Sequence, residues 1–300
     1  LALRAAGIRH GGRELVHSLR GMQLVRSREV AQERLLELYH DRIRETVQRV
    51  LSVEDSTQLH ARLLSALEFS GCADSDWLFF HASGAGERAA AYRYGQAAAE
   101  SALAKLAFER AAELFERCVS LSDGGPLERC ALMQQLAIAL DHGGRGSRAA
   151  DVYLEAALIA ERDESVHLFR LATSHLLSSG RFEEGEALLA PLLQALGHRL
   201  PTTTVGLLWA MLWERLKLSI RGLGYVARDA SQVPKEVLAR IDTFDALYLC
   251  TVSMHPLRAA LFMARSVRWA LDAGEPGRVL NALGQLWFSA ALAGRGRAER

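Results

Sequence analysis

Apolar residues recur every three or four positions along most of the chain, which is the spacing that places them on one face of an α-helix. Between residues 97 and 121 they stand at Ala98, Ala102 and Leu106, and then at Ala111, Leu114, Phe115, Cys118 and Leu121. Prolines are few, and aromatic residues make up 7% of the chain, which also favours helix over sheet. The pattern predicts a pair of amphipathic helices in this stretch.

The second helix of this pair recurs twice further along the chain. Each copy has a small residue, a bulky residue four positions later, and a medium-sized residue three positions after that. The copies are Ala111, Phe115 and Cys118; Ala149, Tyr153 and Ala156; and Gly185, Leu189 and Leu192. The small residues are 38 and 36 positions apart, so we predict helix-turn-helix repeats in which a small residue lets two helices approach closely.

This period is similar to that of tetratricopeptide repeats (TPR), which are about 34 residues long. The Trp and Gly usual in the first TPR helix are missing, and an irregular helical bundle is the alternative. Beyond Pro201 the spacing predicts longer helices over 205–220, 234–252, 256–273 and 276–293, three of them with a proline in the first turn. The expected fold class is therefore all-α, a TPR-like helical-repeat superhelix.

The first fifty residues follow a different pattern. It predicts a helix over 12–20 and two short extended segments over 22–28 and 34–39, which together suit the end of a winged helix. Ten arginines against six acidic residues give this piece a net charge of +4. We therefore divide the chain into a partial winged-helix-like segment (1–51), TPR-like helix pairs (52–200) and further helical repeats truncated at the C-terminus (201–300).

Composition and charge exclude several classes of protein. Half of the 300 residues are apolar and 24% are charged, so the chain has enough apolar residues for a sizeable core. The longest uncharged run, 279–294, is too short to cross a bilayer. The net charge is +1, so no chain-wide field attracts nucleic acid or an anionic membrane, and we expect neither as a partner. Four cysteines without a CxxC pair indicate reduced thiols in a cytoplasmic protein.

Motifs with known chemistry are missing or misplaced. The three lysines, Lys105, Lys217 and Lys235, do not follow a glycine, so there is no phosphate-binding loop, and no kinase catalytic loop occurs. A GxGxxA motif at 222–227 has the form of a dinucleotide-binding loop, but it follows a predicted helix instead of a strand. We therefore interpret it as a turn that ends this helix. The ten histidines form no HExxH motif, and there is no GxSxG motif around a serine. We expect no catalytic, cofactor-binding or metal-binding residue in this chain.

Five aromatic residues stand out beyond residue 200. They are Trp209, Trp213, Trp269, Trp287 and Phe288. They suit either a groove for a peptide or ligand, or the packed core of a helical array. We favour the core, and exposure separates the two interpretations.

Several short motifs resemble those of a family of large bacterial signalling proteins. They are residues 38–45 (LYHDRIRE), 84–87, 106–114, 220–223, 238–242 and 270–276. The family joins a serine/threonine protein kinase to a STAND-type AAA ATPase and a helical-repeat tail. Nearly the whole chain is covered by this resemblance, and the HDRIRE segment is its most distinctive part.

The resemblance implies that this chain is the tail of a longer protein, since it also begins without methionine. The ATPase and kinase would precede Leu1, and ATP and magnesium would serve them and not this fragment. The expected function is non-catalytic signal transduction through protein–protein interaction. A possible interdomain motif consists of His40, Asp41, Arg42, Arg44 and Glu45. The alternatives are a DNA-binding regulator that uses the winged-helix end, and a small enzyme of unrecognised type.

Overall fold

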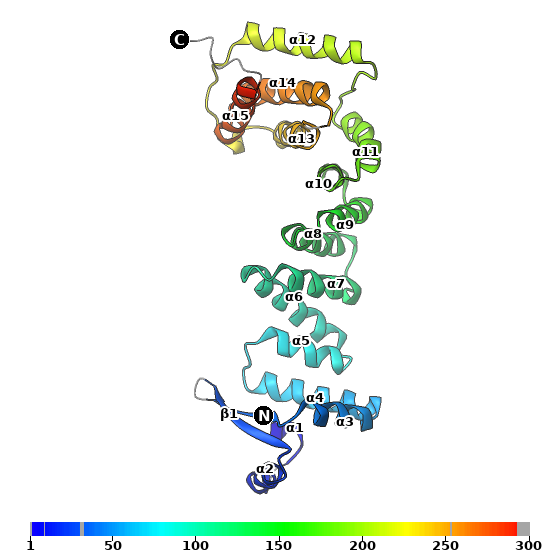
Figure 1. The fold of residues 1–300 in the computed structure, drawn as a ribbon, viewed down its shortest axis with the longest axis vertical. Coiled ribbons are helices and arrows are strands. Elements are labelled where there is room, and N and C mark those ends of the chain that lie inside the picture. The colour runs from blue at the N-terminus through cyan, green and yellow to red at the C-terminus, as the bar shows by residue number, and fades with distance from the viewer. Residues whose placement is uncertain (1, 9, 31–32, 253, 293–300) are drawn as a thin grey trace. The chain divides into compact units, whose positions relative to one another are not determined.

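The structure, a computed structural model, describes residues 2–8, 10–30, 33–252 and 254–292. These residues form fifteen α-helices, a short 3₁₀ helix and a two-stranded hairpin (Figure 1). Contacts divide the chain into two compact units, unit 1 (Leu1–Gly125) and unit 2 (Pro126–Arg300). Within each unit most helices pack against the next one along the chain, like a repeat array. In the described part of the chain, no helix combines the length and the apolar character that a bilayer crossing requires.

After one short helix, unit 1 contains the predicted helix and hairpin, with strands over 25–30 and 33–38 where the sequence predicts 22–28 and 34–39. The strands are antiparallel, with Val25 opposite Leu38. The elements of this unit are α1 (Ala2–Ala5), α2 (Gly12–Gly21), β1 (Val25–Val30), β2 (Glu33–Leu38), α3 (Asp41–Val50), α4 (Val53–Phe69), α5 (Ser75–Gly84), α6 (Arg88–Ala104) and α7 (Phe108–Leu121).

Unit 2 contains the four longer helices predicted beyond Pro201. Two of the three prolines open their helices, whereas Pro234 is the N-cap, one residue before its helix. The elements are α8 (Pro126–His142), α9 (Gly146–Ile159), α10 (Arg162–Ser178), α11 (Phe182–Ala195), α12 (Thr204–Arg221), the 3₁₀ helix η1 (Ala230–Gln232), α13 (Lys235–Thr251), α14 (Pro256–Ala273) and α15 (Pro276–Leu292).

The small residue of each repeat copy is the fourth residue of its helix. Ala111 in α7, Ala149 in α9 and Gly185 in α11 are all buried. At Gly185 the approach is close enough that a Cβ atom would lie 2.7 Å from Leu177 Cδ2 in α10. The other repeat positions are buried as well: Phe115, Cys118, Tyr153, Ala156, Leu189 and Leu192.

A fourth copy of the pattern, which the sequence analysis missed, lies in α14. Its fourth residue is Ala259, followed four positions later by Met263 and three later by Ser266. Ala259 and Ser266 are fully buried. Ala259 follows Gly185 by 74 residues, twice the repeat period, because α12 and the connection after it stand between the two copies.

The helix pair α13–α14 continues the succession that α12 interrupts. α13 packs against α10 as well as against α14, whereas α12 packs against α14 (Figure 1). The pairs α8–α9, α10–α11 and α13–α14 therefore follow one another, and α12 lies outside this succession.

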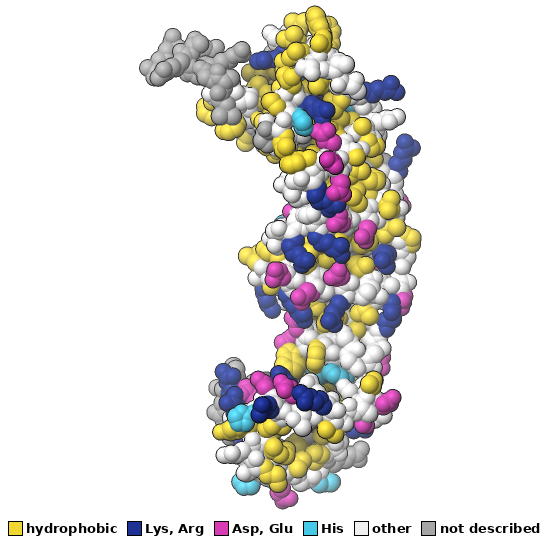
Figure 2. Space-filling model, turned by 45° about the vertical axis from the view of Figure 1, so that its right-hand side comes forward, with side chains coloured by type: hydrophobic (Ala, Val, Ile, Leu, Met, Phe, Trp, Pro, Cys, Tyr) yellow, Lys and Arg dark blue, Asp and Glu magenta, His cyan; other side chains and the backbone are white. Residues whose placement is uncertain are grey.

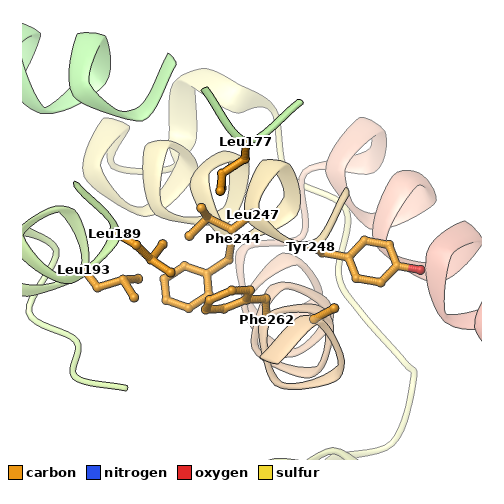
Figure 3. Close-up of a cluster of buried hydrophobic side chains, with 8 residues drawn as sticks. Leu177, Leu189, Leu193, Phe244, Leu247, Tyr248 and Phe262 are labelled. Carbon is orange, nitrogen blue, oxygen red and sulfur yellow. The ribbon is translucent and has the colours of Figure 1, made fainter. Parts of the chain in front are cut away.

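A buried apolar cluster joins the last two pairs. Leu177 of α10 and Leu189 and Leu193 of α11 meet Phe244 of α13 and Phe262 of α14 (Figure 3). The two phenylalanine rings are edge to face, with centroids 5.6 Å apart. Since burying each such side chain contributes about 1.5–3 kcal/mol, this cluster stabilises the succession of pairs that excludes α12.

The two units do not coincide with the three predicted segments. Contacts divide the chain between Gly125 and Pro126, inside the segment 52–200. The boundaries at 51/52 and 200/201 stay predictions.

We expect Gly185→Val to destabilise unit 2 by about 1–3 kcal/mol, because the new side chain overpacks the contact with Leu177. Gly284→Val is the matched control. Gly284 lies in α15 and has no atom within 4 Å of its would-be Cβ, so its replacement should change stability by less than about 0.5 kcal/mol. Urea unfolding followed by circular dichroism measures both, and equal losses at the two positions would contradict the close approach.

Candidate interaction surface

The nine repeat positions are packing residues. All nine are buried between helices of their own unit. A side chain used in this way is not available to a ligand, so a functional surface has to be sought elsewhere.

The motif His40, Asp41, Arg42, Arg44 and Glu45 lies at the start of α3, and none of its five residues is buried. α3 begins at Asp41, which places this carboxylate near the positive end of the helix dipole. His40 is the N-cap, but its side chain does not accept a capping hydrogen bond. Arg44 Nη2 lies 3.2 Å from Asp41 Oδ1. The structure therefore brings Asp41 and Arg44 together as a local ion pair.

One acid, Glu37, lies beside two arginines of the N-terminal hairpin. Arg26 Nε lies 3.1 Å from Glu37 Oε2, and Arg28 Nη1 lies 3.4 Å from Glu37 Oε1. Some residues counted in the charge balance lie outside the described residues: Arg9 entirely, and the side chains of Glu29, Glu33 and Arg34. In the described part, α2 and α3 bury no side chain, and α1 contacts α4.

The described residues contain no group of three or more His, Cys, Asp or Glu side chains placed to hold a metal ion. The four cysteines are free thiols. Burial raises the pKa of the Cys118 thiol to about 11, and burial also raises the pKa of Cys250. Such thiols stay protonated near neutral pH, and a protonated thiol is a poor nucleophile.

Exposure decides between the two interpretations of the aromatic residues. Trp269 packs against both apolar clusters of unit 2. The other four are between 56% and 76% exposed: Trp209, Trp213, Trp287 and Phe288. The core-packing interpretation is therefore wrong for four of the five.

The largest run of exposed apolar side chains lies on α12. Seven of them follow one side of the helix, and we call this set the outer face of α12. Its members are Val205, Leu208, Trp209, Leu212, Trp213, Leu216 and Ile220. Hydrophobic side chains gather at this end of unit 2 in Figure 2. Exposed apolar patches of this kind mark interaction sites.

The opposite side of α12 holds the helix on α14. Leu207 and Glu214 are buried there. Glu214 Oε2 accepts a hydrogen bond of 2.9 Å from Arg268 Nε of α14. Nearer the C-terminal end of α12, Arg221 Nε donates to Asp272 Oδ1 at 2.5 Å. These contacts fix which side of α12 faces outward.

Both ends of α12 have the expected local signals. The Thr203 hydroxyl caps the start by accepting from the Gly206 amide at 3.1 Å. The helix ends at Gly222, whose φ is +73°, as the helix-ending turn predicted for 222–227 requires. The connection then returns to α14, where a Cβ on Gly274 would overlap the Val226 carbonyl oxygen.

Basic residues flank the outer face of α12. Residues 199–228 contain five basic side chains, Arg199, Arg215, Lys217, Arg221 and Arg228, and a single acid, the buried Glu214. The charge balance of this segment, +4, equals that of the N-terminal piece. A cavity of about 520 Å³ adjoins it between α12, α14 and α15, lined by Met211, Leu218, Met263 and Leu286 among others.

No protein-family model matches the chain, and no curated protein shows significant similarity to it. The family resemblance therefore depends on the short motifs alone.

We expect the double substitution Trp209→Ser, Trp213→Ser to change the free energy of unfolding by less than about 0.5 kcal/mol, because both side chains are already in water. Leu207→Ala, on the buried side of the same helix, should cost about 2–5 kcal/mol. Urea unfolding of the three proteins tests this. A tryptophan variant as unstable as Leu207→Ala would mean that the outer face is covered by the chain itself.

We also expect no sequence-specific DNA binding by the N-terminal piece, because acids are interleaved with its arginines and pair with Arg26, Arg28 and Arg44, whereas affinity requires cations free to neutralise phosphates. Fluorescence anisotropy on duplexes of varied sequence, at near-physiological salt, measures this. A dissociation constant of about 10⁻⁸ M or tighter for one sequence over others would favour the DNA-binding regulator instead.

Proposed function

We propose that this chain is a non-catalytic, protein-binding tail of a bacterial signalling protein that also contains a STAND-type AAA ATPase and a serine/threonine protein kinase. The single observation that carries the binding role is the exposed outer face of α12. It lies outside the succession of helix pairs, so its exposure adds nothing to the packing of the array.

The proposal also states which type of helical repeat the chain contains. The helix pairs of 52–200 are TPR-like, and α13–α14 is a further pair of the same kind. Four second helices with a small residue at the fourth position support this, because a repeat unit reuses one packing solution. Residues 1–51 are the end of a winged helix, and its exposed motif from His40 to Glu45 faces the preceding modules of the parent protein.

The partner on α12 is a protein surface with an apolar strip and acidic flanks. The outer face presents apolar side chains at positions 205, 209, 212, 216 and 220, the spacing with which one helix docks onto another or into a groove. Arg215 and Lys217 favour an acidic counterpart, since charge complementarity adds specificity and speeds association. The parent's own ATPase or kinase module is the partner we propose.

Binding at α12 would then regulate the parent protein. A module held on α12 in one state and released in the other shifts the balance between the states by its difference in affinity. ATP and magnesium act at the parent's modules. The chain described here supplies only the outer face of α12, to which the module binds.

The test begins with the coding sequence upstream of Leu1, which should encode a phosphate-binding loop and, further upstream, a kinase catalytic loop. The encoded ATPase module, produced separately, should bind the 1–300 chain in isothermal titration calorimetry. Trp209→Ser, Trp213→Ser should weaken this binding by about tenfold or more, since buried tryptophans at interfaces contribute about 2 kcal/mol or more.

Trp287→Ser, which removes an equally exposed tryptophan from α15, is the matched control and should bind normally. The 1–300 chain alone should show no magnesium-dependent ATP turnover. An upstream sequence without either motif would overturn the family assignment. If the double variant bound the ATPase module with unchanged affinity, the role of α12 would be overturned. If the chain bound anionic lipid vesicles through the same tryptophans, the partner would be a membrane and not a protein.

A further inference from the structure

Four nitrogen-bearing side chains gather where the loop after α11 meets α13 and α14. They come from three separate segments of the chain, and we call them the arginine cluster: His198, Arg240, Arg265 and Arg268. The helices that supply them also supply two aromatic walls, Phe244 and Trp269.

The side chains surround the two rings closely. The His198 and Trp269 ring centroids are 4.8 Å apart. Arg240 Cζ lies 4.9 Å from the Trp269 centroid, and Arg268 Cζ lies 5.6 Å from it. Arg265 Cζ lies 5.9 Å from the centroid of Phe244, which packs edge to face against Trp269 with centroids 4.8 Å apart. The whole cluster therefore occupies one small region of unit 2.

Cations outnumber acids in this region. The buried carboxylate of Glu214, whose side chain is 8% exposed, lies 2.9 Å from Arg268 Nε and 3.8 Å from Arg265 Nε. Asp272, half exposed, lies 3.7 Å from Arg268. Arg240 forms no salt bridge within the described part of the chain, and its guanidinium lies over the Trp269 ring. Arg240 is partly buried, and its Nε atom is buried without a partner, so the cluster contains a guanidinium group that no acid of the described residues balances.

Nitrogen atoms without a hydrogen-bond partner are a second, independent sign that the cluster can accept an anion. Three buried nitrogens of the cluster have no hydrogen-bond partner within the described part of the chain: His198 Nε2, Arg240 Nε and Arg265 Nη1. Buried polar atoms are nearly always paired in folded proteins, and an exception calls for a bound water or ion. Burial is the main cause that lowers the pKa of Arg265. The charge of Glu214 raises this pKa, and the charge of Arg268 lowers it further. Burial, followed by Arg265 and Arg240, also lowers the pKa of His198.

We propose that the arginine cluster is a binding site for a small oxyanion of the phosphate class. Guanidinium groups donate paired hydrogen bonds that match phosphate oxygens, and the fixed planar fork suits a tetrahedral anion better than a single point charge does. The apolar walls strengthen such hydrogen bonds by excluding water. This proposal does not depend on the proposed function of α12, because neither the residues nor the ligand are shared with its outer face.

The first experiment uses the unaltered 1–300 chain with inorganic phosphate as the probe. Phosphate should raise the thermal unfolding midpoint in a saturable way, because a ligand that binds only the folded state stabilises it. Sodium chloride at the same ionic strength should not. Equal shifts with both salts would overturn the proposal without any variant.

Two substitutions locate the site. Arg240→Met and Arg265→Met each remove one cation and leave an apolar side chain in its place. Arg240 forms no salt bridge among the described residues, and the acid beside Arg265, Glu214, keeps its ion pairs with Arg268 and Lys217, so both variants should fold. Each should weaken phosphate binding by about 10-fold to 100-fold in isothermal titration calorimetry, as expected for the loss of a charged hydrogen bond. Arg215→Met removes an exposed arginine from α12 and should leave the affinity unchanged.

A last measurement tests whether the bound anion is free phosphate or a phosphate ester. O-phosphoserine that binds more tightly than inorganic phosphate would assign the site to an esterified phosphate, and equal or weaker binding would assign it to the free ion. Wild-type affinity in Arg240→Met and Arg265→Met, with loss in Arg215→Met, would show that phosphate binds the basic surface and not the cluster.

Discussion

The close approach of paired helices at one small residue is the constraint on which the array depends. Ala111, Ala149, Gly185 and Ala259 are each the fourth residue of the second helix in a pair. A small side chain there lets the helices come together, so that in the first three copies the residues one and two turns later are buried against the neighbouring helix. Where the small residue is glycine, the partner Leu177 occupies the space that a methyl group would need.

The position of α12 follows from this packing. Because α13 packs against α10 and α14, the array continues across the interruption and leaves no place for α12 among the pairs. α12 is nevertheless apolar on nearly all sides, which is a composition typical of a helix with several packing partners. It has α14 on one side, held by Leu207 and Glu214, and its outer face is exposed to solvent.

The two proposed sites differ in their chemistry although both involve α14 and its neighbours. The outer face of α12 is apolar, exposed and flanked by cations, which suits a large surface of a partner protein. The arginine cluster is small and largely buried, with hydrogen-bond donors that lack partners, and it suits a small anion. Glu214 lies between them: it anchors α12 to α14 and is the buried acid that faces Arg265 and Arg268.

The sequence by itself determined the helical class, the N-terminal helix and hairpin, the four long helices beyond Pro201 and three of the four repeat copies, because these depend on spacings within a few residues of the chain. The copy at Ala259 was hidden, since an inserted helix doubled the distance to Gly185. Tertiary structure alone decided which apolar residues are covered. Trp269 and Trp209 both lie in apolar helices, but Trp269 packs against a buried cluster of α13 and α14, whereas Trp209 is 70% exposed. Tertiary structure alone also brought His198, Arg240 and Arg265 together. Periodicity shows that a helix has an apolar face, whereas the burial of that face depends on which distant helix packs against it.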